Sequence, residues 1–106
     1  HVLRGEDLLS STAQQIWLME TLGYTPPVYT HVPMLVDEYG NRLSKRQHGI
    51  TIRSLRERGM TAEAILSHLA YAGGLVPERR SYSRDELIRC CDFRKLRKEP
   101  IVVKML

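Results

Sequence analysis

The spacing of apolar residues predicts strands and one long helix in the first part of the chain. Residues 1–3 are typical of the end of a strand, and a polar turn follows at residues 4–7. The pattern Ser11-x-x-Gln14 has the form of a capping box, so we expect a helix to begin there and to end at Gly23. Because apolar side chains cover most of its circumference, we expect this helix to be largely enclosed.

The next segment, residues 28–36, has the apolar and β-branched composition of a strand. Pro33 interrupts it, since proline cannot donate a hydrogen bond to a neighbouring strand. We expect a turn at residues 37–41, after which Arg42-Leu43 returns as a short hairpin arm.

The second half of the chain is predicted to be helical. Thr51 is expected to cap a short helix that runs to about residue 58, with Ile52 and Leu55 facing inward. Thr61 begins a second helix, and residues 83–86 have the form of a capping box for a third. The remaining predicted core positions are Ala62, Ile65, Leu66, Leu69, Ala72, Phe93 and Leu96. The order of strand, helix, strand pair and three helices predicts an α/β segment that runs into an all-helical one.

Composition and charge narrow the class of protein only slightly. The 106 residues, of which 42% are hydrophobic and 26% charged, allow one domain with one modest core. The net charge of +4 makes nucleotides or nucleic acids plausible partners, although many ordinary soluble proteins carry such a surplus.

Targeting signals and metal motifs are not found in the sequence. No apolar run approaches the ~20 residues of a membrane span, and Arg4 breaks any secretory pattern at the start, so we expect a cytoplasmic protein. The two cysteines, Cys90 and Cys91, are adjacent, which suits neither a disulfide nor a zinc site. We therefore expect reduced thiols and no bound metal.

Arg4 is the first candidate site residue. It follows a predicted strand and precedes a helix, which is where open α/β sheets bind their ligands. Its planar guanidinium can donate two parallel hydrogen bonds to a carboxylate. The alternative is an internal salt bridge to Glu6 or Asp7.

The second candidate is the basic loop "NRLSKRQHG", residues 41–49. A lysine on a loop can follow the negative charge that shifts during phosphate chemistry, and a serine hydroxyl adds a donor. Gly40 and Gly49 flank the loop and permit it to move. The alternative is a solvated charged loop without a ligand.

Three segments in this order resemble the glutamyl-tRNA synthetase family of class I aminoacyl-tRNA synthetases. They are "HVLRGEDLLSSTAQQIWLMETLGY", "HVPMLVDEYGNRLSKR" and "AEAILSHLAYAGGL". The resemblance runs from His1 to about Phe93, and it extends to the short glutamyl-queuosine tRNA(Asp) synthetases.

The resemblance implies a fold and a set of ligands. Residues 1–50 would be the C-terminal half of a Rossmann-like nucleotide-binding catalytic domain with its KMSKS-type loop, and residues 51–106 a helical connector toward the tRNA. Arg4 would bind the glutamate substrate. Lys45 would be the catalytic residue of the loop, steadying the phosphates of ATP, which enters with Mg²⁺. The other implied ATP-binding residues are Met34, Leu35, Arg42, Leu43, Ser44 and Arg46.

Departures from the family pattern define the alternatives. Arg42 stands where lysine is usual, and Arg46 replaces the final serine of the signature, as is common in the glutamyl branch. No histidine here forms the first class I signature, so we expect a fragment that lacks the N-terminal half of the domain and is inactive alone. Glutamate, ATP and tRNA would be partners of the intact protein. The alternatives are a glutamyl-queuosine tRNA(Asp) synthetase fragment and a non-catalytic tRNA-binding paralogue with a basic surface.

Overall fold

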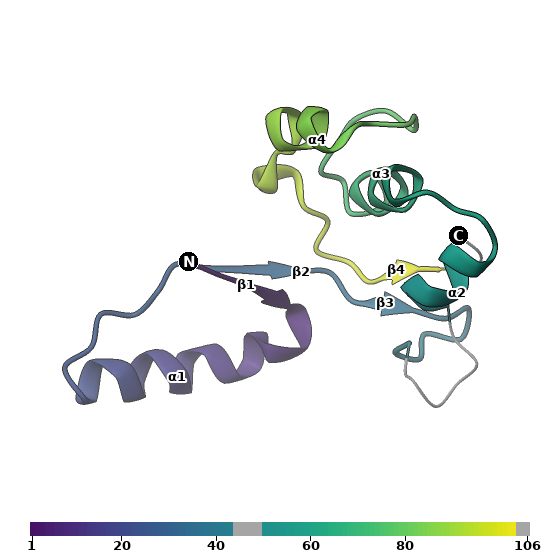
Figure 1. Cartoon of the computed structure of the whole chain (residues 1–106). Coiled ribbons are helices and arrows are strands. Elements are labelled where there is room, and N and C mark those ends of the chain that lie inside the picture. Colours follow the sequence, from purple (N-terminus) through teal and green to yellow (C-terminus); the bar gives the residue numbers. More distant parts are fainter. Residues whose placement is uncertain (44–49, 104–106) are drawn as a thin grey trace.

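The computed structural model describes residues 1–43 and 50–103 (Figure 1). A strand–helix–strand unit comes first, and short helices and a last strand follow it. The elements are β1 (Val2–Gly5), the 3-10 helix η1 (Glu6–Leu8), α1 (Leu9–Thr21), β2 (Tyr29–Val32), β3 (Leu35–Val36), α2 (Ile52–Glu57), α3 (Ala62–Ala72), α4 (Arg84–Cys90), the 3-10 helix η2 (Phe93–Lys95) and β4 (Ile101–Val102).

β1 and β2 are parallel neighbours joined through α1 (Figure 1). In their register Arg4 lies opposite His31 and Gly5 opposite Val32. Gly23, with a φ of +83°, ends the helix as expected, because a left-handed backbone costs glycine little. The carboxyl ends of β1 and β2 therefore meet at one edge of the sheet.

Two expectations for α1 are wrong. The helix begins at Leu9, with Leu8 as an N-cap that makes no side-chain hydrogen bond, so Ser11 already lies inside it. The reason is that η1 runs directly into α1 and replaces a capping box. No residue of α1 is buried, and Trp17 and Leu22 are 66% and 63% exposed, so the helix is not enclosed by the described residues.

The strand pair is confirmed, and one further strand was not predicted. β2 ends before Pro33, and β3 resumes two residues later. The turn and the hairpin arm are as expected, because Arg42 bridges Val36 in antiparallel fashion. The unpredicted strand β4 pairs with β3 in parallel, and the Ile101 N–H donates to the Met34 carbonyl at 2.8 Å.

The helical part follows the predicted caps closely. The side chains of Thr51, Thr61 and Ser83 each accept a backbone N–H from the residue three positions on. Leu55 is buried, but Ile52 is 55% exposed and does not face the core as expected. Of the other expected core positions, Ile65 is buried, Leu69, Ala72 and Leu96 are half-buried, and Ala62, Leu66 and Phe93 are exposed.

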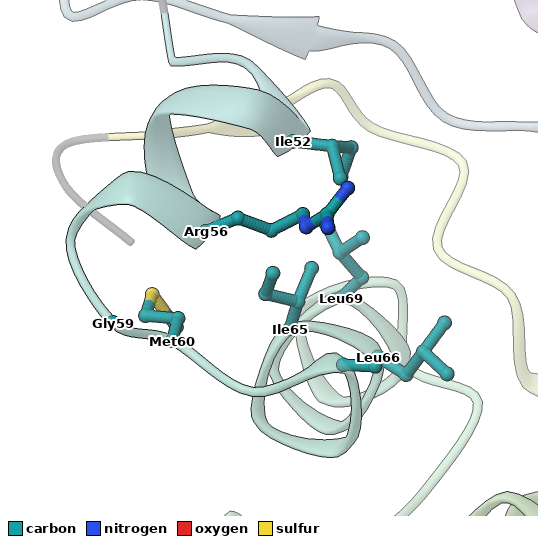
Figure 2. Close-up of a pocket in the computed structure, with 8 residues that line it drawn as sticks. Ile52, Arg56, Gly59, Met60, Ile65, Leu66 and Leu69 are labelled. Atoms are coloured by element: carbon teal, nitrogen blue, oxygen red, sulfur yellow. The ribbon is translucent and has the colours of Figure 1, made fainter.

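The space between α2 and α3 explains the exposure of Ile52. A mostly apolar pocket of about 410 Å³ lies between the two helices and is lined by Ile52, Met60 and Leu66 among others. Figure 2 shows the side chain of Arg56 pointing across this pocket toward Leu69.

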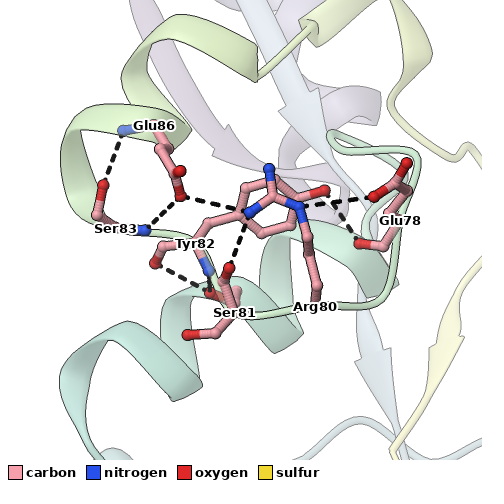
Figure 3. A network of polar contacts seen from close by, with 7 residues as sticks. Glu78, Arg80, Ser81, Tyr82, Ser83 and Glu86 are labelled. Atoms are coloured by element: carbon pink, nitrogen blue, oxygen red, sulfur yellow. Dashed lines mark hydrogen bonds and ion pairs between the residues drawn. The ribbon is translucent and has the colours of Figure 1, made fainter.

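A polar network fixes the segment between α3 and α4 (Figure 3). The Tyr82 N–H donates to Ser67 Oγ at 2.7 Å, and that hydroxyl lies within 3.2 Å of the Tyr82 carbonyl, so a buried serine holds a buried tyrosine. The Arg80 guanidinium lies 3.7 Å from the Tyr82 ring centre and pairs with Glu86 at 3.4 Å. The Ser83 backbone N–H is the largest cause that lowers the pKa of Glu86. The loop is therefore held from both helices.

Candidate active site

Arg4 lies in the middle of a polar cluster at the carboxyl end of β1. Its Nε donates to His31 Nε2 at 3.2 Å, and its Nη2 donates to the Thr12 hydroxyl at 2.8 Å. Its guanidinium carbon lies 4.7 Å from the ring centre of Tyr29. The neighbouring strand β2 and the helix α1 thus contribute the contacts that orient the guanidinium.

The cluster also sets the state of His31. Arginine can only donate, so His31 Nε2 must accept, which places the ring hydrogen on Nδ1. The ring also stacks on Tyr29, with centroids 6.0 Å apart. His31 is therefore a neutral acceptor that holds Arg4 from the side.

Arg4 has no ion pair with any acidic residue in the described ranges 1–43 and 50–103. The internal salt bridge to Glu6 or Asp7, weighed from the sequence, is thus not made. Asp7 instead pairs with Arg42 at 3.3 Å. The positive charge of Arg4 is held by neutral groups, an arrangement that suits an anionic ligand.

The Asp7–Arg42 pair joins two of the predicted site segments. Asp7 lies three residues beyond Arg4, and Arg42 is the first cation of the basic loop. The flank of the loop therefore lies against the carboxyl end of β1. Ser44, Lys45 and Arg46, the rest of the predicted phosphate-binding set, lie outside the described residues.

Met34 lies in the break between β2 and β3, and Leu35 is the first residue of β3. A Cβ on Gly5 would lie 3.6 Å from the Met34 sulfur and 2.5 Å from Asp7 Oδ1, so this glycine permits a close approach of three segments. The Leu35 carbonyl accepts from the Leu43 N–H at 3.2 Å. Met34, Leu35, Arg42 and Leu43 are thus linked to the end of β1 through backbone and side-chain contacts.

Sequence reasoning missed the residues that hold Arg4. The sequence alone assigned no role to His31, Thr12 or Tyr29. A signal was present: Tyr29 and His31 alternate along one strand, so they share a face. Only the register of β1 against β2 places that face beside Arg4.

The described residues contain neither a cluster of metal-ligating side chains nor a membrane-spanning helix. Within residues 1–43 and 50–103, no group of three or more His, Cys, Asp or Glu side chains could hold a metal ion. No helix of that described portion is long and apolar enough to span a bilayer.

Comparison with known families identifies the family of the chain. Residues 1–105 match the family described as "tRNA synthetases class I (E and Q), catalytic domain". The chain belongs to this family. The resemblance seen in the sequence motifs is confirmed, and the class I synthetase family supplies the ligase chemistry against which the site is interpreted.

Curated relatives in the synthetase family carry two names. The chain is 41% identical over 101 residues to a glutamyl-Q tRNA(Asp) synthetase of Symbiobacterium thermophilum, covering 95% of this chain and 31% of that protein. It is 36% identical over 104 residues to a glutamate–tRNA ligase of Aquifex aeolicus, covering 96% of this chain and 22% of that protein. The chain thus spans less than a third of the length of either relative.

Solved synthetase structures share the fold. The glutamate–tRNA synthetase of Elizabethkingia anophelis superposes with a TM-score of 0.79 at 27% identity, over 98% of this chain and 25% of that one. A glutamate tRNA ligase of Elizabethkingia meningosepticum, solved in complex with its amino acid, gives 0.76 at 27% identity over 96% and 24% of the two chains. The arrangement of helices and small parallel strands is therefore that of a class I catalytic domain.

Proposed function

We propose that this chain is part of a glutamate–tRNA ligase, an enzyme that activates glutamate with ATP and transfers it to tRNA. The observation that carries the proposal is Arg4, a guanidinium oriented by His31 and Thr12 without an acidic partner in the described part of a synthetase catalytic domain. Such a group binds a carboxylate through charge-assisted hydrogen bonds.

The residues divide into two roles in this proposal. Arg4 binds a carboxylate of glutamate. The loop that begins at Arg42 binds ATP, and Lys45 stabilises the charge that develops as the glutamate α-carboxylate attacks the α-phosphate and pyrophosphate leaves. Met34 and Leu35 lie against the adenine, and Leu43, Ser44 and Arg46 complete the ATP-binding set. Mg²⁺ would enter with ATP, because this ion is usually bound through substrate phosphates and water with few protein ligands.

The division into two parts stays a prediction. Residues 1–50 would be the C-terminal half of the nucleotide-binding domain, and residues 51–106 a helical connector that contacts tRNA. The pairing of β4 with β3 crosses this boundary, so the end of the second part returns to the first.

Lys45→Ala tests the function in the full-length protein that carries this sequence. We expect glutamate-dependent ATP–pyrophosphate exchange, measured with saturating tRNA, to fall by about 100-fold, because a preorganised charge contact is lost. Arg53→Ala, which removes an exposed cation paired with Glu57, is the matched control and should leave the rate unchanged. An exchange rate of Lys45→Ala equal to that of the control would refute the assigned role.

A glutamyl-queuosine tRNA(Asp) synthetase is the second candidate, favoured by the 41% identity to the Symbiobacterium protein. The two candidates share glutamate activation and differ in the RNA acceptor. Labelled glutamate transferred to tRNA(Glu) supports the ligase, and transfer to tRNA(Asp) supports the second candidate. Binding of tRNA without any exchange activity would instead favour a non-catalytic paralogue.

A further inference from the structure

A cavity of about 390 Å³ lies beside the Arg4 cluster, between β2, the start of α1 and the segment that follows α4. The segment of residues 93–98, here called the basic strap, forms one wall of it. The lining residues from the opposite wall are Glu6, Leu9, Thr30 and His31. None of the functions proposed above uses this cavity.

The basic strap combines cations with an exposed aromatic ring. It carries Arg94, Lys95, Arg97 and Lys98 within six residues, and Phe93 is 52% exposed. Arg94 is engaged by Asp92 through two contacts of 3.0 and 3.1 Å. Arg97 and Lys98, by contrast, make no ion pair with an acidic residue within the described ranges.

These residue types match the two parts of a nucleotide. An exposed aromatic ring offers a surface on which any base can stack, and nearby arginine and lysine side chains bind phosphate. Leu9 and Leu96 add apolar surface to the same cavity. Glu6 is the one acidic residue among its described lining residues, so the lining keeps a positive balance.

A single side chain, that of His31, connects the cavity to Arg4. His31 lines it, and His31 Nε2 accepts the hydrogen bond from Arg4 Nε at 3.2 Å. An RNA strand bound along the basic strap would therefore pass directly beside Arg4, which the proposed function assigns to glutamate binding.

We propose that this cavity binds a nucleotide of the RNA substrate, with its base on Phe93 and its phosphate on Arg97 and Lys98. The inference rests on the proposed function, because it takes tRNA as the partner. A free nucleotide would offer the same chemistry. The RNA is favoured because the basic strap also carries Lys95, a cation that does not line the cavity and that can meet the phosphate of a neighbouring nucleotide.

Phe93 provides the first test in the full-length protein, with unfractionated tRNA as the probe. Phe93→Ala and Phe93→Leu should each weaken tRNA binding by about tenfold, because both remove the stacking surface. Phe93→Tyr keeps the ring and should bind normally. Leucine retains apolar volume, so equal affinity of Phe93→Leu and the unaltered protein would overturn the inference.

The two cations provide the second test. Arg97→Ala combined with Lys98→Ala should reduce the magnitude of the slope of log affinity against log salt concentration by about 0.7, the value for one lost phosphate contact with a single strand. Arg53→Ala with Arg89→Ala removes the same charge from exposed positions on α2 and α4. An equal change of slope in both pairs would show a general charge effect and would overturn the site.

Separate measurements of the KM for ATP and the KM for tRNA distinguish a failure of the RNA site from a failure of the proposed function. The KM for ATP in the exchange reaction should not change in the Arg97→Ala/Lys98→Ala variant, whereas the KM for tRNA should rise. A rise in the KM for ATP alone would assign the cavity to a free nucleotide and contradict the RNA site. Normal ATP–pyrophosphate exchange with an unchanged KM for tRNA would contradict the RNA site and leave the proposed function intact. RNA binding that depends on Phe93, in a protein without any exchange activity, would support the RNA site and contradict the proposed function.

Discussion

At the scale of single residues, the proposed binding of glutamate depends on how Arg4 is oriented. Arg4 could be predicted as a ligand-binding group from its position after a strand, but its supports could not. His31 and Thr12 lie 27 and 8 residues away in the sequence, and only the folded register brings them to within 3.2 and 2.8 Å of the guanidinium. Their contribution is to orient Arg4, since neither carries a formal charge in this arrangement.

His31→Leu tests this positioning role. Loss of the acceptor should raise the KM for glutamate by about tenfold with a smaller change in kcat, because a hydrogen bond to a charged group contributes about 1.5–3 kcal/mol. His31→Gln places a carbonyl oxygen in reach of Arg4 Nε and should restore much of the affinity. The KM for ATP serves as the internal control, because His31 is assigned only to the glutamate contact and its substitution should leave the KM for ATP unchanged. If the glutamine and leucine variants bind glutamate equally well, His31 does not act through this hydrogen bond.

His68 predicts a dependence of stability on pH. Burial, and then the positive charge of Arg79, lower the pKa of His68 below its ordinary value. The unfolded chain takes up this proton near pH 6.5 and the folded chain only at lower pH, so the unfolded state binds more protons in between. The free energy of unfolding should therefore fall as the pH falls below about 6.5. Denaturation curves of His68→Gln should lack this component; an unaltered pH profile would contradict the assignment.

At the scale of elements, local chemistry decided which predictions succeeded. The caps at Thr51, Thr61 and Ser83 were correct because each cap is made by a side chain and a backbone N–H only three residues away. The start of α1 was wrong because η1 supplies a preceding turn that no capping pattern reports. β4 has two residues and exists through pairing with β3, so no periodicity could reveal it.

Ser83→Ala should destabilise α4. The Ser83 hydroxyl accepts the Glu86 N–H at 3.1 Å, and the Glu86 carboxylate accepts the Ser83 N–H at 3.0 Å, so the substitution breaks half of the capping box. We expect the free energy of unfolding to fall by about 1 kcal/mol. Ser81→Ala, two residues earlier in an exposed position, is the control. Hydrogen exchange at the first amides of α4 should accelerate in the first variant only.

At the scale of the whole molecule, several large apolar side chains are exposed, and the curated relatives are much longer than this chain. Trp17 on α1, Leu22 at the C-cap of α1 and Ile88 on α4 are each more than 60% exposed. The chain covers 22–31% of the curated relatives compared above. The amphipathic pattern correctly located the helices but could not say which faces the described residues would cover, since burial depends on partners as well as on pattern.

The Asp7–Arg42 pair is the feature of this scale that bears on function. It joins the end of β1 to the flank of the basic loop at 3.3 Å, although the pair itself is largely solvated and contributes little stability. Its significance is geometric, because it places Arg42, the flank of the proposed phosphate-binding loop, on the same edge of the molecule as Arg4. Arg4, the proposed carboxylate contact, and Arg42, which belongs to the proposed ATP-binding set, thus both lie near the carboxyl end of β1, the place where open α/β sheets bind their ligands.

The most direct measurement is glutamate-dependent ATP–pyrophosphate exchange by Arg4→Ala in the full-length protein, with saturating tRNA. The KM for glutamate should rise by about 10- to 100-fold, the size expected for a lost charge-assisted contact, while the KM for ATP stays nearly constant. Equal changes in both constants, or no change in either, would contradict the claim that this arginine binds the amino acid.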